Sequence, residues 1–317
     1  MPSITALLPV SWAKPIMLTH EPTIHTLHDA LDAYQRMYMP SRNFAPKTRS
    51  GYADDLRDLL RFLDGQGRTR PVDVVPADLD AFLAHLDRRG LAGASRRRKT
   101  YASKSFFAFL HRAGHIPQNP AQELIPPRSE RKEPRVLSAA EYQALLRACS
   151  HHPRDSAIIE LLLQTGIRLS ELTRLRVTDV ELPRRITRDA ETVGRTHILA
   201  KGRKTRWIPL NYKACRALKT WLDMRPEATD ALFITKFGQP IGPRAVQQLV
   251  RKHMSEVGIS GASVHALRHT FATHHVAKGT SLRTVQEVLG HADLKTTSIY
   301  VQLAQEAVKR ELQENAL

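Results

Sequence analysis

The sequence predicts a mainly helical protein with two domains and one small antiparallel sheet. Three observations lead to this fold class. Apolar residues recur at three- and four-residue spacing through most of the chain, two short alternating runs stand close together, and a proline-rich charged stretch separates two helical regions. A length of 317 residues with 42% hydrophobic content is enough for two buried cores.

The chain opens with MPSITALLPVSWAKPIML, which is mildly apolar and interrupted by prolines. This stretch lacks the basic start of a signal peptide, and no apolar run approaches the roughly 20 residues that cross a bilayer. We expect residues 1–22 to form a flexible appendage.

Residues 23–124 predict a helical domain. Four segments have helical periodicity: TLHDALDAYQRMYM, KTRSGYADDLRDLLRFLDG, ADLDAFLAHLDRRG and SRRRKTYASKSFFAFLHRAG. We expect Ser95 to cap the last helix. The four cations that follow, Arg96, Arg97, Arg98 and Lys99, stand where the helix macrodipole disfavours positive charge. This placement suggests an external anion, although a solvated charged turn would have the same pattern.

Residues 125–136 predict a linker, because IPPRSERKEPR combines prolines and charges without periodicity. Residues 137–317 then form a second domain. A capping box at Ser138 and Glu141 opens its first helix, which runs to about Cys149, and DSAIIELLLQTG predicts a second helix that ends at Gly166. A short helix, SELTRL, follows.

THILA and RWIPL, separated by KGRKT, predict a β-hairpin with a basic turn. The segment before it, PRRITRDAETVGR, has mixed charges and no apolar rhythm, so we expect an extended surface loop. Further helices are expected from Asn211, from Pro243, from Ser263, from Ser281 to Gly290, and from Asp293 onward.

The charge balance predicts an anionic partner. The 48 Lys and Arg against 31 Asp and Glu give a formal net charge of +17. The excess is spread over the whole chain, which favours wrapping a long polyanion such as double-stranded DNA over tethering by a basic tail. Cys149 and Cys215 are far apart and are interpreted as buried reduced thiols, so we expect a cytoplasmic protein.

The stretch HALRHTFATH raises a question about histidine chemistry. His265 and Arg268 share a helix face, and His269 lies on the same side. A metal site is disfavoured, because no carboxylate or cysteine nearby in the chain completes a coordination shell. A purely structural helix is the alternative on this stretch alone. We interpret His269 and His274 as structural residues.

Other motifs change this interpretation. TGIRLSEL contains Arg168 and Glu171, AKGRK contains Lys201, VLGH contains His291, and Tyr300 follows. Together with HALRHTFATH, in this order, these motifs resemble the tyrosine recombinase family of phage integrases and Xer-type recombinases. The N-terminal half resembles the family only in its architecture.

The resemblance implies a helical core-binding domain and an α+β catalytic domain that form a clamp around DNA. It also implies that Tyr300 attacks a DNA phosphate to give a 3′-phosphotyrosine, without a metal or other cofactor. Arg168 and Arg268 would bind the phosphate, because guanidinium is permanently charged and bidentate toward phosphate oxygens. His265 is the candidate partner for the tyrosine proton or a further phosphate ligand.

In the same resemblance Lys201 is the general acid, with Lys204 as an alternative. His291 bonds the phosphate, and Glu171 holds the geometry of the site without contacting the phosphate itself. The candidate DNA-binding residues outside this set are Arg96, Arg97, Arg98, Lys99, Lys104, Arg203 and Lys204. The final segment, VQLAQEAVKRELQENAL, predicts an amphipathic helix that docks on a neighbouring subunit of a DNA-bound tetramer, or else folds back on its own domain.

The expected function is therefore site-specific recombination, for integration or excision of a mobile element or for resolution of replicon dimers. A non-catalytic DNA-binding regulator of the same fold is the main alternative. A type IB topoisomerase would share the chemistry, but the short chain disfavours it.

Overall fold

A computed structural model of the protein describes residues 24–128, 133–189, 193–199, 205–290 and 299–305. The chain divides into two compact units between Lys132 and Glu133, inside the expected linker. We call them the helical unit and the C-terminal unit, and each is described by itself. No helix in the described part of the chain is long and apolar enough to cross a membrane.

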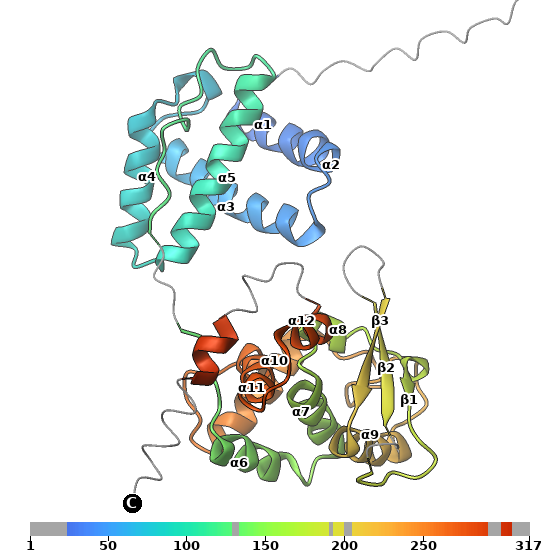
Figure 1. The fold of residues 1–317 in the computed structure, drawn as a ribbon. Helices are drawn as coiled ribbons and strands as arrows, with labels where there is room; N and C mark the ends of the chain where they lie inside the picture. The colour runs from blue at the N-terminus through green and yellow to red at the C-terminus, as the bar shows by residue number, and fades with distance from the viewer. Residues whose placement is uncertain (1–23, 129–132, 190–192, 200–204, 291–298, 306–317) are drawn as a thin grey trace, which may run out of the picture. The chain divides into compact units, whose positions relative to one another are not determined.

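The helical unit is a small bundle, as the periodicity predicts (Figure 1). Its helices are α1 (Leu27–Ala33), a π-helical turn η1 (Tyr34–Tyr38), α2 (Met39–Ser41), α3 (Pro46–Gly65), the 3-10 turn η2 (Pro71–Asp73), α4 (Pro76–Arg88) and α5 (Gly93–Arg112). Leu56, Leu59, Leu60 and Leu63 of α3 are fully buried because their spacing places them on one face of the helix.

The C-terminal unit is built around α7 and a small sheet. Its elements are α6 (Ala139–Cys149), α7 (Pro153–Thr165), α8 (Leu169–Leu172), the 3-10 turn η3 (Val177–Asp179), β1 (Val180–Glu181), β2 (Gly194–Leu199), β3 (Thr205–Leu210), α9 (Tyr212–Met224), α10 (Pro243–Glu256), α11 (Val264–Ala277) and α12 (Leu282–Leu289). Helix α7 packs against α9 on the sheet side and against α11 on the other (Figure 1). Residues 299–305 form a further helical segment.

The sheet has three antiparallel strands in the order β1-β2-β3. Strands β2 and β3 are the expected hairpin, and His197 pairs with Trp207 in its register. Strand β1 was not expected; it pairs with β2 through Val180 and Thr196. The charged segment interpreted as a surface loop connects β1 to β2.

Two helix boundaries, the end of α7 and the start of α5, can be compared with the expectation from the sequence. Gly166 ends α7 in the left-handed region, with φ of 62°, as expected for a glycine after a helix. The start of α5 differs from the expectation: the helix begins at Gly93, so Ser95 lies inside its first turn and does not cap it.

Both cysteines are buried in the C-terminal unit. Burial raises the pKa of the Cys149 thiol to about 11, and burial also raises the pKa of Cys215. The two side chains are therefore protonated thiols at neutral pH.

Candidate active site

The end of α7 lies against α11 and α12. A side-chain Cβ at Gly166 would lie 2.5 Å from Cδ1 of Phe271 and 2.8 Å from Cδ2 of Leu289. Only glycine fits both this space and the positive φ. The close approach places Arg168, two residues later, beside α11 and the end of α12.

Glu171 links two arginines. Its carboxylate accepts from the backbone N–H of Arg168 at 2.8 Å, which caps α8, and from Arg168 Nη1 at 3.0 Å. Arg206 of β3 donates from Nη1 and Nη2 to the two carboxylate oxygens at 3.1 and 3.0 Å. Burial raises the pKa of Glu171, but the bonds from Arg206 and Arg168 outweigh it and hold this pKa below its usual value. Glu171 is thus a buried, ionised carboxylate.

The two candidate phosphate-binding arginines converge on the end of α12. Arg268 is buried on α11, donates from Nη2 to the Leu289 carbonyl at 2.8 Å and also bonds the Gly166 carbonyl. Arg168 Nη2 donates to the Gly290 carbonyl at 2.7 Å. Burial, with the nearby charge of Arg168, lowers the pKa of Arg268 to about 10. The Arg268 guanidinium therefore remains charged at neutral pH, with the guanidinium of Arg168 nearby.

Gly290 makes room for these cations. Its φ is 64°, and a Cβ there would lie 2.9 Å from Nη1 of Arg206 and 3.4 Å from Nη1 of Arg168. The glycine that ends α12 thus serves both the left-handed turn and the arginine cluster.

Tyr300 lies in a small apolar cluster beside these arginines. The cluster consists of Phe271, Ala272, Val285, Leu289 and Tyr300. The tyrosine is 2% exposed, and its hydroxyl lies 3.2 Å from Nδ1 of His269. Burial raises the pKa of Tyr300, while the charges of Arg268 and Arg168 act in the opposite direction. The phenol is therefore protonated in this structure and lies in the field of both arginines.

The structure brings together Arg168, Glu171, Arg268 and Tyr300 from the expected set. His265 lies exposed in the first turn of α11, one turn before His269. Lys201, Arg203, Lys204 and His291 lie outside the described residues. Among the residues that the structure describes, no group of three or more histidine, cysteine or carboxylate side chains could hold a metal ion.

Two residues of this site were missed by the sequence interpretation. His269 was assigned a structural role, although its position four residues after His265 placed it on the same helix face. Arg206 was not considered at all. In RWIPL it shares the inward face of β3 with Ile208 and Leu210, and a cation on the apolar face of a strand is the signal that points to it.

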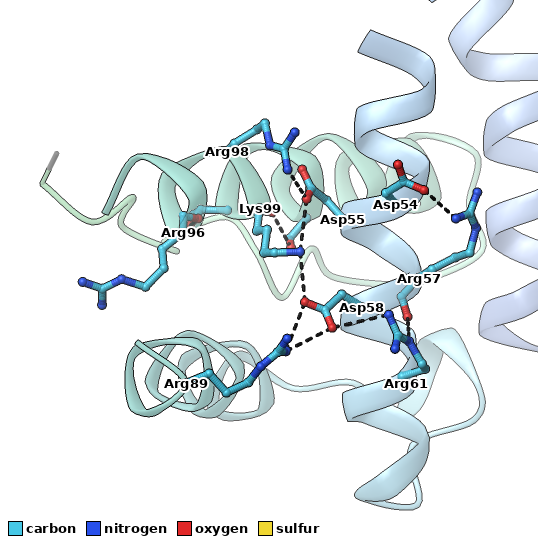
Figure 2. Close-up of polar contacts among 11 residues, drawn as sticks. Asp54, Asp55, Arg57, Asp58, Arg61, Arg89, Arg96, Arg98 and Lys99 are labelled. Carbon is cyan, nitrogen blue, oxygen red and sulfur yellow. Dashed lines mark hydrogen bonds and ion pairs between the residues drawn. The ribbon is translucent and has the colours of Figure 1, made fainter. Parts of the chain in front are cut away.

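The basic run on α5 divides between the interior and the surface of the helical unit (Figure 2). Lys99 is buried, and its Nζ lies 3.1 Å from Asp55 and 2.9 Å from Asp58 of α3. The expectation that Lys99 contacts DNA is therefore corrected. Four consecutive residues cover every side of a helix, so one of the four cations has to face the bundle.

The neighbouring cations have different surroundings. Arg98 is exposed but bonds Asp55 at 2.8 Å, and Arg96 pairs with Asp87 at 2.5 Å. Arg97 is exposed, with its guanidinium 5.7 Å from the ring centre of Tyr101. Lys104 donates to the carbonyls of Gln122 and Leu124 at 2.7 and 2.9 Å and so anchors the segment that leaves the bundle. Arg97 and Arg98 remain the surface cations of the run.

Comparisons with known proteins agree with this arrangement. Family models described as "Phage integrase family" and "Phage integrase, N-terminal SAM-like domain" match residues 135–307 and 31–114. A tyrosine recombinase XerC from Pseudomonas syringae pv. tomato is 36% identical over 282 residues, which cover 86% of this chain and 91% of the relative.

Two solved structures share the fold. A lambda integrase tetramer bound to a Holliday junction superposes with a TM-score of 0.71 at 20% identity, over 88% of this chain and 78% of the other. XerH recombinase bound to a palindromic difH substrate gives 0.69 at 21% identity, over 89% and 83%.

Proposed function

Since the chain belongs to the phage integrase family of tyrosine recombinases, we propose that Tyr300 is the nucleophile with which this site-specific recombinase cleaves DNA. The observation that supports this most directly is the position of the phenol in the field of Arg168 and Arg268, which come from two different elements. A tyrosine that only filled a core would not require two cations beside it.

The arginine pair supplies what the reaction needs. A DNA phosphodiester is an anion that takes on further charge in a pentacoordinate transition state. Arg168 and Arg268 would bind its two non-bridging oxygens, in place of the Gly290 and Leu289 carbonyls that they contact here. Lysine in either position would lose the fork that holds two oxygens at once.

The cleavage step forms a bond between the Tyr300 Oη and phosphorus and breaks the bond from phosphorus to the 5′-oxygen. The products are a 3′-phosphotyrosine and a free 5′-hydroxyl, whose proton comes from Lys201 or, alternatively, Lys204. The phenol proton would pass to a base, for which the exposed His265 is the candidate unless it only bonds the phosphate, and His291 would bond the phosphate. Because the phosphotyrosine retains the energy of the broken bond, a different 5′-hydroxyl can attack it and rejoin the strands without ATP.

We propose that strand exchange takes place in a DNA-bound tetramer, the state named for the lambda integrase structure of the same fold. Ala304 is buried and Leu303 packs against the Tyr300 cluster, so residues 299–305 belong to their own domain. We propose that the segment after them, residues 306–317, docks on a neighbour. Truncation after Gln305 should abolish cooperative assembly on a two-half-site DNA while leaving half-site binding intact; unchanged assembly would contradict the idea.

The biological task fits integration or excision of a mobile element, or resolution of replicon dimers. A non-catalytic regulator with the same fold is not favoured, because such a protein has no use for a nucleophile beside two arginines.

A nicked DNA substrate that traps the covalent intermediate tests the proposal. The 5′-hydroxyl fragment diffuses away after cleavage, so the protein–DNA adduct accumulates and survives denaturant. The wild type should form this adduct and Tyr300→Phe should not, while both bind the DNA equally. Adduct formation by Tyr300→Phe, or by neither protein, would overturn it.

A further inference from the structure

Two carboxylates on α3 connect several basic residues of the helical unit, and this network carries an inference that rests on the DNA-binding part of the proposed function. We propose that Arg89, the residue that follows α4, binds a DNA phosphate and that Asp58 of α3 is the residue that positions it. Neither residue was expected at the DNA surface from the sequence.

The network has more cations than carboxylates (Figure 2). Asp55 and Asp58 lie one turn apart on α3. The cations paired with them are Arg61, Arg89, Arg98 and Lys99. Because four cations share two carboxylates, two positive charges of this network have no carboxylate partner among the described residues. Such an excess at a surface attracts an external anion.

Asp58 holds Arg89 through a single nitrogen. Nη1 of Arg89 lies 3.1 and 3.3 Å from the two oxygens of the Asp58 carboxylate, and the arginine side chain is 45% exposed. The other two nitrogens of this guanidinium, Nη2 and Nε, have no hydrogen-bond partner among the residues that the structure describes. They can therefore donate to a phosphate while Nη1 stays on the carboxylate.

Asp58 is itself held from the interior. Its side chain is only 13% exposed and lies 2.9 Å from Nζ of the buried Lys99. Burial raises the pKa of Asp58, but the bonds from Lys99 and Arg89 outweigh it and hold this pKa below its usual value. The ionised carboxylate thus fixes a long, exposed side chain before DNA arrives, so less side-chain freedom is lost on binding.

Asp54, one turn earlier on α3, provides the contrast. It pairs with Arg57 at 2.6 Å, but both side chains are exposed and the carboxylate has no buried cation behind it among the described residues. A surface pair of this kind holds its arginine weakly. Asp54 therefore offers a matched control with the same charge on the same helix.

Equilibrium binding to a fluorescently labelled double-stranded DNA tests the role of Asp58, because phosphate contacts do not depend on base sequence. Asp58→Asn and Asp54→Asn each remove one negative charge, so electrostatics alone predicts tighter DNA binding for both. We expect Asp54→Asn to bind at least as tightly as the wild type. Asp58→Asn should instead bind about threefold more weakly, because Arg89 is no longer held in place. Binding by Asp58→Asn as tight as that of the wild type would overturn the inference.

Two surface variants test Arg89 itself and do not depend on the folding of Asp58→Asn. Arg89→Ala should weaken binding about eightfold at about 0.1 M salt and lower the slope of the logarithm of the association constant against the logarithm of salt concentration by about one unit. Arg89→Lys keeps the charge, but its single ammonium stays on Asp58, so it should resemble Arg89→Ala. Wild-type binding by either variant would contradict a phosphate contact.

The double variant Asp58→Asn with Arg89→Ala distinguishes positioning from a general effect on the fold. A residue that acts only through Arg89 has no further effect once Arg89 is gone, so the double variant should bind as Arg89→Ala does or more tightly. Still weaker binding would show that Asp58 supports the whole unit and would overturn the positioning role. Failure of the proposed function has a different signature, since the wild type would then bind DNA and form no adduct.

Discussion

The carboxylate of Glu171 accepts hydrogen bonds from both terminal nitrogens of Arg206, which lies 35 residues further along the chain on β3. The same carboxylate bonds Arg168. Glu171 therefore balances two cations at once, and a single buried side chain connects the turn end of the β2–β3 hairpin to Arg168, the arginine proposed to bind phosphate.

Removal of Arg206 should slow cleavage through its effect on Glu171 and Arg168. In Arg206→Ala, Glu171 pairs with Arg168 alone and holds its guanidinium away from the phosphate. We expect adduct formation to fall at least about tenfold, equivalent to about 1.4 kcal/mol. Arg206→Lys should not recover it, because lysine lacks the fork.

Arg195→Ala is the matched control, since Arg195 pairs with Glu181 on the neighbouring strand but is exposed. It should leave the adduct rate unchanged. If Arg206→Ala and the wild type form adduct at equal rates, the bonds from Arg206 through Glu171 to Arg168 do not contribute to cleavage.

The crowded turn at Gly290 gives a second prediction. Gly290→Ala should lose cleavage activity, because its Cβ meets Arg206 and Arg168. Gly279 also has a positive φ, of 83°, but nothing lies within 4 Å of a Cβ there. Both variants should lose about 1 kcal/mol of unfolding free energy from the left-handed backbone. Only Gly290→Ala should lose adduct formation; equal activity of the two folded variants would argue against crowding.

The stability of the helical unit should depend on Lys99. Lys99→Met leaves Asp55, a buried carboxylate, with less compensation, so we expect the free energy of unfolding to fall by about 3 kcal/mol in urea denaturation. Adding Asp55→Asn should recover part of the loss, because the uncompensated charge is removed. If the change in unfolding free energy of the double variant equals the sum of the changes in the two single variants, Lys99 and Asp55 do not interact directly.

Arg97→Ala is the companion variant for DNA binding. It removes an exposed cation, so stability should change little. The logarithm of the DNA association constant should vary less steeply with the logarithm of salt concentration, by about one unit of slope, if Arg97 contacts a phosphate. An unchanged slope would place Arg97 outside the DNA surface.

Glu171 also predicts a pH dependence of stability. Its pKa is lowered in the folded state, so its contribution is fully present above about 4.3, the value of an ordinary glutamate, and is lost as pH falls through the folded pKa. Glu171→Gln should therefore be less stable than the wild type at neutral pH, and the difference should shrink in acid. Urea denaturation at several pH values measures it; a constant difference would contradict this assignment.

The fold was largely predictable from the sequence because its helices are marked at both ends. Apolar spacing predicts α3, α4 and α5, and Gly166 and Gly290 end α7 and α12 as expected. Strand β1 could not be predicted, because two residues carry no periodicity and owe their conformation to pairing with β2.

The sequence predicted those site residues whose side-chain type is suited to a single chemical role. Two arginines and a tyrosine in recognisable motifs have few alternative uses, and the structure brings Arg168, Arg268 and Tyr300 together. His269 and Arg206 were missed because their partners, Tyr300 and Glu171, lie far away in the chain. Lys99 was misassigned because a run of four consecutive cations does not indicate which of them faces the interior of the bundle.

The two buried thiols open a practical route to the motion of this recombinase. Because Cys149 and Cys215 are buried and protonated, thiol-reactive dyes should leave them unmodified in the folded protein. Single cysteines introduced at exposed positions, such as Tyr101 in the helical unit and Met224 in the C-terminal unit, would then take up a fluorescent donor and acceptor selectively. Energy transfer between these dyes would report how the two units approach one another when DNA is added.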